Sequence, residues 1–227
     1  MTTIADNLAR VRDRIADAAS RYGRTPGDIR LLAVSKTKPV TDVEAAIAAG
    51  QDAFGENYLQ DALPKVMALP DEEWHFIGHI QSNKTRDIAA SFDWVHTVAS
   101  EKVARRLSTQ RPAGKAPMKI LIQVNISAEE GKSGVAPAEV ASLAAFCAAC
   151  ENLAPVGLMA IPEATGDEGA QRAVFAKLAS LRASVATESG IAGFNELSMG
   201  MSRDLEAAVA EGATWLRIGT DIFGARD

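Results

Sequence analysis

The sequence is poor in the residues that mark several large classes of protein. Aromatic residues make up 5% of the 227 positions, and there are two cysteines and three histidines. No apolar run approaches the roughly 20 residues that a helix needs to cross a bilayer. No cluster of lysine and arginine stands out, and the formal net charge is −5. The composition therefore argues against a membrane partner and against a nucleic-acid surface.

The N-terminal segment also lacks the apolar core of a signal peptide and instead alternates charged and apolar residues at helical spacing. We therefore expect a cytoplasmic protein. Cys147 and Cys150 form one CxxC inside a predicted helix, with no second pair in the chain, so we expect small core residues rather than a redox or zinc site. The spacing of His75 and His79 does not match a metal-binding element, and we expect no metal.

Short, continuous apolar runs recur along the chain, and such runs are typical of buried parallel strands. Helical patterns separate them; one begins at an apparent capping box, Thr41 to Glu44, and another at Ser202. The predicted strands cover residues 31–35, 52–56, 74–78, 94–98, 119–125, 155–160, 196–199 and 215–219. The predicted helices cover residues 7–22, 41–49, 59–69, 82–90, 100–110, 137–151, 169–189 and 202–211.

Eight strands that alternate with helices predict a single (β/α)₈ barrel of the TIM type with an extra N-terminal helix. A doubly wound open sheet is the alternative. No linker rich in glycine, serine or proline interrupts the series, so residues 1–227 are expected to form one domain.

Polar residues gather where the predicted strands end, which is where barrels of this type carry their sites. Lys36 directly follows the first strand, and partial desolvation there would favour the neutral amine that forms a Schiff base. By position alone, an ordinary solvated lysine is an equal alternative. Gly219 and Thr220 follow the eighth strand, and loops after strands 7 and 8 often bind phosphate. Arg217 lies within that strand and would either form a structural salt bridge or face a ligand.

Six ordered motifs carry a resemblance to a known family. They are AVSKTKP (33–39), FGENYLQD (54–61), WHFIGHIQSNK (74–84), GLMAIP (157–162), LSMGMSRDLEAAV (197–209) and RIGTDIFGARD (217–227). The chain resembles the pyridoxal phosphate homeostasis proteins, also known as proline synthetase co-transcribed homologues. The resemblance runs from the first strand to the last residue.

The resemblance implies a monomeric barrel like the N-terminal domain of alanine racemase, with pyridoxal 5′-phosphate (PLP) held as an internal aldimine on Lys36. It implies that Ser198, Gly219 and Thr220 hold the phosphate and that Arg217 faces the pyridine nitrogen. Asn57 and His79 would line the pocket. Asp221 departs from the small residue common at its position, so its carboxylate is expected to point outward, away from a phosphate.

Two hypotheses about activity remain open at this point. An arginine beside the pyridine nitrogen weakens the electron sink on which PLP enzymes usually depend, and the chain leaves no length for the second domain of a racemase. We therefore expect a PLP carrier or regulator without robust turnover, with PLP-dependent apo-enzymes as its recipients. The alternative is a PLP-dependent enzyme such as a small amino-acid racemase. Tyr58 has no assigned role.

Overall fold

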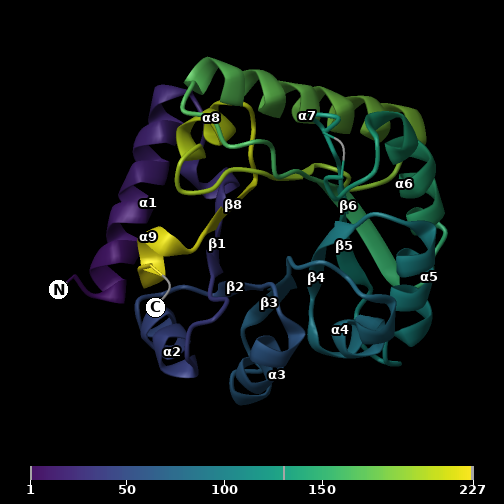
Figure 1. Cartoon of the computed structure of the whole chain (residues 1–227), viewed down its shortest axis with the longest axis horizontal. Helices are drawn as coiled ribbons and strands as arrows, with labels where there is room; N and C mark the ends of the chain where they lie inside the picture. The colour runs from purple at the N-terminus through teal and green to yellow at the C-terminus, as the bar shows by residue number, and fades with distance from the viewer. Residues whose placement is uncertain (1, 130, 226–227) are drawn as a thin grey trace.

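The computed structural model describes residues 2–129 and 131–225 and shows a closed barrel of parallel strands (Figure 1). The strands follow one another around the barrel in chain order, which confirms the predicted barrel and excludes the open sheet. They are β1 (Arg30–Val34), β2 (Ala53–Glu56), β3 (Glu73–Phe76), β4 (Trp94–Val98), β5 (Met118–Gln123), β6 (Leu153–Met159), β7 (Glu196–Ser198) and β8 (Trp215–Ile218).

Helices connect the strands and cover the outside of the barrel, and α1 precedes the first strand as predicted. They are α1 (Ile4–Arg21), α2 (Val40–Ala48), α3 (Leu59–Ala68), α4 (Thr85–Ser91), α5 (Glu101–Gln110), α6 (Val140–Ala148), α7 (Glu168–Ser189), α8 (Leu205–Ala210) and α9 (Thr220–Phe223). Within the described residues, no helix combines the length and apolarity that crossing a bilayer requires.

Two predicted helix caps were wrong. Helix α2 begins at Val40, with Pro39 as its N-cap, so Thr41 lies inside the first turn and forms no capping box. The N-cap of α8 is Asp204 rather than Ser202, and the Asp204 carboxylate instead accepts a hydrogen bond from the backbone N–H of Met201, at 2.5 Å. In both places the helix has another N-cap residue than the one that the sequence pattern indicates.

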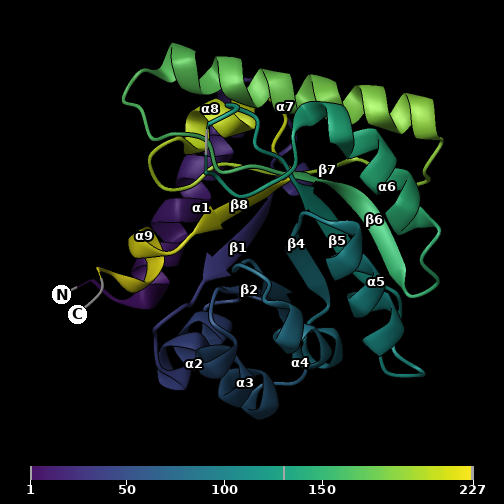
Figure 2. The same cartoon turned by 45° about the vertical axis from the view of Figure 1, so that its right-hand side comes forward.

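The last helix, α9, packs against the first helix, α1. Helix α9 lies against α1, so the described ends of the chain lie on the same side of the molecule (Figure 2). Asn7 of α1 donates a hydrogen bond to the carbonyl of Ile222, at 2.8 Å. The short α9 was not predicted, because four residues carry too little periodicity to indicate a helix. This contact holds the segment after β8 against the barrel wall.

Cys147 is a buried residue of α6, as expected, whereas Cys150 lies beyond the end of that helix and is half-buried. Burial raises the pKa of the Cys147 thiol to about 12, so it behaves as a small apolar side chain. Among the described residues, no three His, Cys, Asp or Glu side chains form a group that could hold a metal.

Strands β6 and β7 approach each other closely at Gly157. A Cβ atom at this position would lie 1.9 Å from the carbonyl oxygen of Glu196, which belongs to the neighbouring backbone. We expect Gly157→Ala to lower the free energy of unfolding by about 3 kcal/mol, since the backbone itself must move. Urea unfolding followed by circular dichroism measures the change.

Gly27→Ala is the matched control for Gly157→Ala, because a Cβ at Gly27 meets no atom within 4 Å. Its stability should stay within about 0.5 kcal/mol of the wild type. Equal effects of the two substitutions would contradict the close approach of β6 and β7.

Candidate functional site

A cavity of about 810 Å³ opens at the carboxyl ends of the strands. It brings together five of the seven predicted site residues, which come from strand ends far apart in the sequence: Lys36, Asn57, Arg217, Gly219 and Thr220. The loop after β7 adds Met201 and Ser202 to the lining. The cavity therefore lies at the carboxyl ends of the strands, where the sequence predicted the site.

Lys36 stands at the start of the turn that follows β1 and is half-buried. The next residue, Thr37, has a φ of 64°, in the left-handed region that a β-branched residue rarely adopts. Such a conformation costs on the order of 1–3 kcal/mol and persists where the surrounding structure imposes it. The chain thus holds the backbone beside Lys36 in one specific, strained turn.

Arg217 is buried within β8, with 5% of its surface exposed, and it lines the cavity. Its guanidinium donates hydrogen bonds to Ser198 Oγ at 2.7 Å and to the carbonyl of Ala160 at 3.0 Å. Burial lowers its pKa to about 10, against the opposing charge of Asp204, so the group stays cationic. No carboxylate of the described residues forms an ion pair with it, which disfavours the structural salt bridge that sequence left open.

Close backbone contacts shape two sides of the cavity. A Cβ at Gly78 would lie 1.9 Å from the carbonyl oxygen of Asn57, so a side chain there would displace the Asn57 backbone. A Cβ at Gly219 would lie 3.1 Å from the carbonyl of Val34, next to the strand that leads to Lys36. The Oδ1 atom of Asn57 is buried and has no hydrogen-bond partner among the described residues.

Two predicted site residues do not line the cavity. Ser198 is fully buried, and its hydroxyl contacts Arg217 and His96, so it lies behind the cavity wall. His79 is exposed. Tyr58 is also exposed and absent from the lining. Asp221 points away, as expected, because its carboxylate lies 3.4 Å from the Arg14 guanidinium on α1.

A buried ion pair that the sequence analysis missed supports the strand ends beside Lys36. Lys65 of α3 lies 2.8 Å from the Glu56 carboxylate and donates a second hydrogen bond to the carbonyl of Ser35, at 2.7 Å. The Ser35 hydroxyl donates to the same Glu56 oxygen, at 2.7 Å. Burial raises the pKa of Glu56, and the bonds from Lys65 and Ser35 oppose the shift. The pair anchors the residue that immediately precedes Lys36.

Comparison with known proteins places the chain in a family. A family model of the alanine racemase N-terminal domain matches residues 6–227. The pyridoxal phosphate homeostasis protein of Pseudomonas aeruginosa is 55% identical over 229 residues, which cover all of this chain and 97% of that protein. The Escherichia coli K12 protein of the same name is 49% identical over 232 residues, covering all of this chain and 98% of the relative.

The chain belongs to the pyridoxal phosphate homeostasis protein family. A solved structure supports the same assignment: PipY of Synechococcus elongatus, determined with PLP bound, superposes with a TM-score of 0.84. It is 35% identical, and the match covers 98% of this chain and all of PipY. The resemblance inferred from the six motifs is therefore confirmed, and so is the alanine racemase-like barrel.

The ion pair beneath the Lys36 turn gives a stability test. Lys65→Met should lower the free energy of unfolding by about 3 kcal/mol or more, because it leaves the Glu56 carboxylate buried without its cation. Adding Glu56→Gln to that variant should restore at least half of the loss. Lys177→Met, at an exposed position on α7, is the control. Denaturant unfolding measures all of them, and a double variant no more stable than the single one would contradict this account.

Proposed function

We propose that the chain binds PLP through a Schiff base on Lys36 and serves intracellular PLP homeostasis, without robust turnover. The observation that carries the proposal is one cavity that holds both the Lys36 side chain and a buried guanidinium cation without a carboxylate contact. An aldehyde-bearing anion such as PLP suits this pair, since the amine attaches the aldehyde and the cation attracts the ring or its substituents.

The donor set of the cavity fits PLP. Arg217 supplies a fixed cation, and the unpartnered Oδ1 of Asn57 supplies an acceptor that a bound group could satisfy. The loops after β7 and β8 contribute Ser202, Gly219 and Thr220, at the place where barrels of this class commonly hold phosphate. When bound, PLP supplies a reactive aldehyde and an electron-withdrawing ring.

Each predicted residue keeps a role in the proposal, although two of the roles are indirect. Gly219 and Thr220 would hold the phosphate, and Arg217 would face the pyridine nitrogen. Ser198 would act through Arg217, because its hydroxyl accepts from that guanidinium and is fully buried. Asn57 would contact the cofactor directly, whereas the exposed His79 would do so only if the rim of the cavity closed over the ligand.

A carrier fits the cavity better than a racemase. Racemisation needs an acid or base on the face opposite Lys36, a role that tyrosine fills in racemases of this barrel class. Among the lining residues that the structure describes, none is tyrosine, histidine or cysteine. The lining does hold other acid or base side chains, but Lys38, Glu168, Asp204 and Glu206 are hydrogen-bonded to Ala225, Tyr22, Met201 and Arg14, respectively. Arg217 beside the ring nitrogen would keep that nitrogen unprotonated and weaken the electron sink. We therefore favour retention and delivery of PLP over chemistry on amino acids.

The wider setting follows from the same proposal. We infer one PLP-binding domain over residues 1–227, a monomer, and a cytoplasmic location. PLP-dependent apo-enzymes are the proposed recipients, since free PLP is a reactive aldehyde that a carrier would keep sequestered.

Lys36→Ala should abolish the absorbance band of the lysine-linked cofactor, because no Schiff base can form at that position. The purified wild type, reduced with borohydride and digested, should carry the pyridoxyl group on Lys36. Spectra before and after reduction, with peptide mapping, measure both. A band that survives Lys36→Ala, with modification mapped elsewhere, would refute the assignment of Lys36.

Thr220→Ala should weaken PLP binding by about 1 kcal/mol or somewhat more, roughly five- to tenfold in Kd, through loss of a hydrogen bond to a charged group. Thr187→Ala, at an exposed position on α7, should leave Kd unchanged. Titration of the apoprotein with PLP gives both values, and equal Kd values for both variants would argue against a phosphate role for Thr220.

Exchange of the α-hydrogen of an amino acid distinguishes a carrier from a racemase. The holoprotein should exchange the α-hydrogen of alanine with deuterated solvent no faster than free PLP does at the same concentration. NMR of alanine in heavy water follows the exchange. Exchange at ordinary enzyme rates, on the order of 1–1,000 per second, would favour the racemase.

A further inference from the structure

The inside of the barrel holds polar side chains where barrels of this type are usually filled by Val, Ile and Leu. His75 and His96 are fully buried, and Nδ1 of His75 lies 2.8 Å from Nε2 of His96. Trp94 stacks on the His75 ring, with centroids 5.1 Å apart, and Trp215 packs edge-on at 4.6 Å. Buried imidazoles are costly unless their nitrogens are hydrogen-bonded, so the pair needs an explanation.

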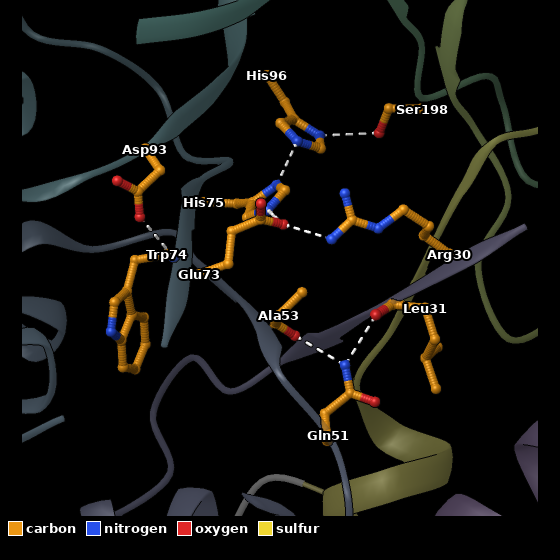
Figure 3. Close-up of polar contacts among 10 residues, drawn as sticks. All are labelled: Arg30, Leu31, Gln51, Ala53, Glu73, Trp74, His75, Asp93, His96 and Ser198. Carbon is orange, nitrogen blue, oxygen red and sulfur yellow. Dashed lines mark hydrogen bonds and ion pairs between the residues drawn. The ribbon is translucent and has the colours of Figure 1, made fainter. Parts of the chain in front are cut away.

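The two histidines are the middle of a longer chain of hydrogen bonds along the barrel, of which Figure 3 draws the part from Glu73 to Ser198. At one end, His75 Nε2 lies 2.9 Å from Glu73 Oε1, at the start of β3. At the other end, His96 Nδ1 lies 2.9 Å from Ser198 Oγ, which accepts a hydrogen bond from Arg217 at 2.7 Å. We name this set the axial chain: Glu73, His75, His96, Ser198 and Arg217.

Hydrogen-bond chemistry fixes the direction of the axial chain. Arg217 can only donate, so the Ser198 hydroxyl accepts from it and directs its own proton to His96 Nδ1. A neutral His96 that accepts at Nδ1 carries its proton on Nε2, where it donates to His75 Nδ1. His75 is then protonated on Nε2 and donates to the Glu73 carboxylate. Every donor along this line finds an acceptor.

The reverse direction fails at both ends. If His96 donated to Ser198, that oxygen would receive two donors and its own proton would need an acceptor elsewhere. A neutral His75 that donated to His96 would present a bare nitrogen to the Glu73 carboxylate, at 2.9 Å, which is repulsive. A second proton on His75, or a proton on the Glu73 carboxyl, would relieve that contact.

Burial disfavours that second proton. It lowers the pKa of His75, and it lowers the pKa of His96 well below its ordinary value, with the charge of Arg217 adding to the effect. Burial also works to raise the pKa of Glu73, but its hydrogen bond with His75 and the charge of Arg30 outweigh this and hold the pKa below its ordinary value. The axial chain thus joins the Glu73 carboxylate to the Arg217 guanidinium through three neutral groups, His75, His96 and Ser198.

Charged groups at the base of the barrel hold the anionic end in place. The Arg30 guanidinium of β1 lies 2.8 Å from Glu73 Oε1 and 4.0 Å from the centroid of the Trp215 ring. Lys119 of β5 lies 4.6 Å from the Trp94 ring centroid. Asp93, just before β4, accepts a hydrogen bond from the backbone N–H of Trp74 and is not part of the axial chain.

We propose that the axial chain makes Glu73 the distal counter-ion of Arg217, a positioning residue that acts on the cavity from the opposite end of the barrel. Each donor polarises the next bond, and such chains strengthen in a low-dielectric interior. Glu73 thereby orients the guanidinium and, in addition to the charge of Asp204 in the cavity lining, moderates its positive field at the cavity. The effect on the cofactor rests on the proposed PLP site, whereas the direction of the hydrogen bonds in the axial chain does not depend on that site.

The direction is tested on the PLP-free protein by ¹⁵N NMR of histidine side chains. With only three histidines, the exposed His79 supplies the solvated reference signal. His75 and His96 should each show a neutral ring protonated at Nε2 across neutral pH. A ring protonated at Nδ1, or a doubly protonated His75, would overturn the proposal.

The influence of Glu73 on the cavity is tested with Glu73→Gln, which keeps an acceptor for His75 and removes the charge. The stronger positive field at the cavity should lower the midpoint of the pH titration of the cofactor absorbance by about half a pH unit. Asp93→Asn removes a carboxylate near the same end of the barrel and should move the midpoint less than half as far. Equal shifts of the midpoint in Glu73→Gln and Asp93→Asn would indicate a field that acts through space, and would overturn the proposal that the axial chain carries the effect.

A double-mutant cycle locates the effect in the axial chain. Ser198→Ala removes the link between His96 and Arg217, so Glu73→Gln in that background should move the midpoint by less than a third of its effect in the wild type. Additive shifts would refute the coupling. If Glu73→Gln does not fold, the tautomers of the wild type still decide the direction.

Failure of the proposed function is distinguishable from failure of this inference. A wild type without a Lys36-dependent absorbance band would refute the PLP site and leave the NMR result standing. A wild type with that band, whose midpoint is unmoved by Glu73→Gln, would refute the inference alone.

Discussion

Backbone hydrogen bonds between β1 and β8 close the barrel, and the cavity depends on that closure. Leu32 of β1 pairs with Arg217 of β8, and Ala33 pairs with Ile218. This register brings the turn that carries Lys36 beside Gly219 and the loop that follows β8. A slip of one residue would turn the Arg217 side chain from the inside of the barrel to the outside, because successive side chains of a strand face opposite sides.

Closure of the barrel also determines which groups surround the buried Arg217 cation. Arg217 forms no ion pair with a carboxylate of the described residues, although the charge of Asp204 acts on it, and its hydrogen bonds go to a hydroxyl and a backbone carbonyl. The interior compensates with a line of neutral polar groups, enclosed by two tryptophans, that ends at Glu73. The side chains in the barrel core therefore both pack together and form polar interactions with Arg217. The strained turn at Thr37 and the Lys65–Glu56 pair hold the backbone on either side of Lys36.

The sequence was most informative where a strand end and a reactive side chain coincide. Lys36, Gly219 and Thr220 could be placed because parallel strands end at one face of a barrel. Ser198 was assigned to the phosphate from its motif, yet it lies behind the cavity wall, since side-chain direction depends on the pleat. The His75–His96 contact left no signal, because the two residues lie on different strands and meet only inside the closed barrel.

The sequence by itself determined the barrel, the approximate positions of the strands and the family, and it singled out Lys36 as a candidate, because periodic apolar runs and ordered motifs are local properties of the chain. Only the tertiary structure decided which polar groups share the cavity and which support it from behind. The partners of Glu56 lie 9 and 21 positions away in the sequence, and Ser198 lies 19 positions from Arg217 and 102 from His96. Their hydrogen bonds depend on strand register and side-chain direction, which no local pattern encodes.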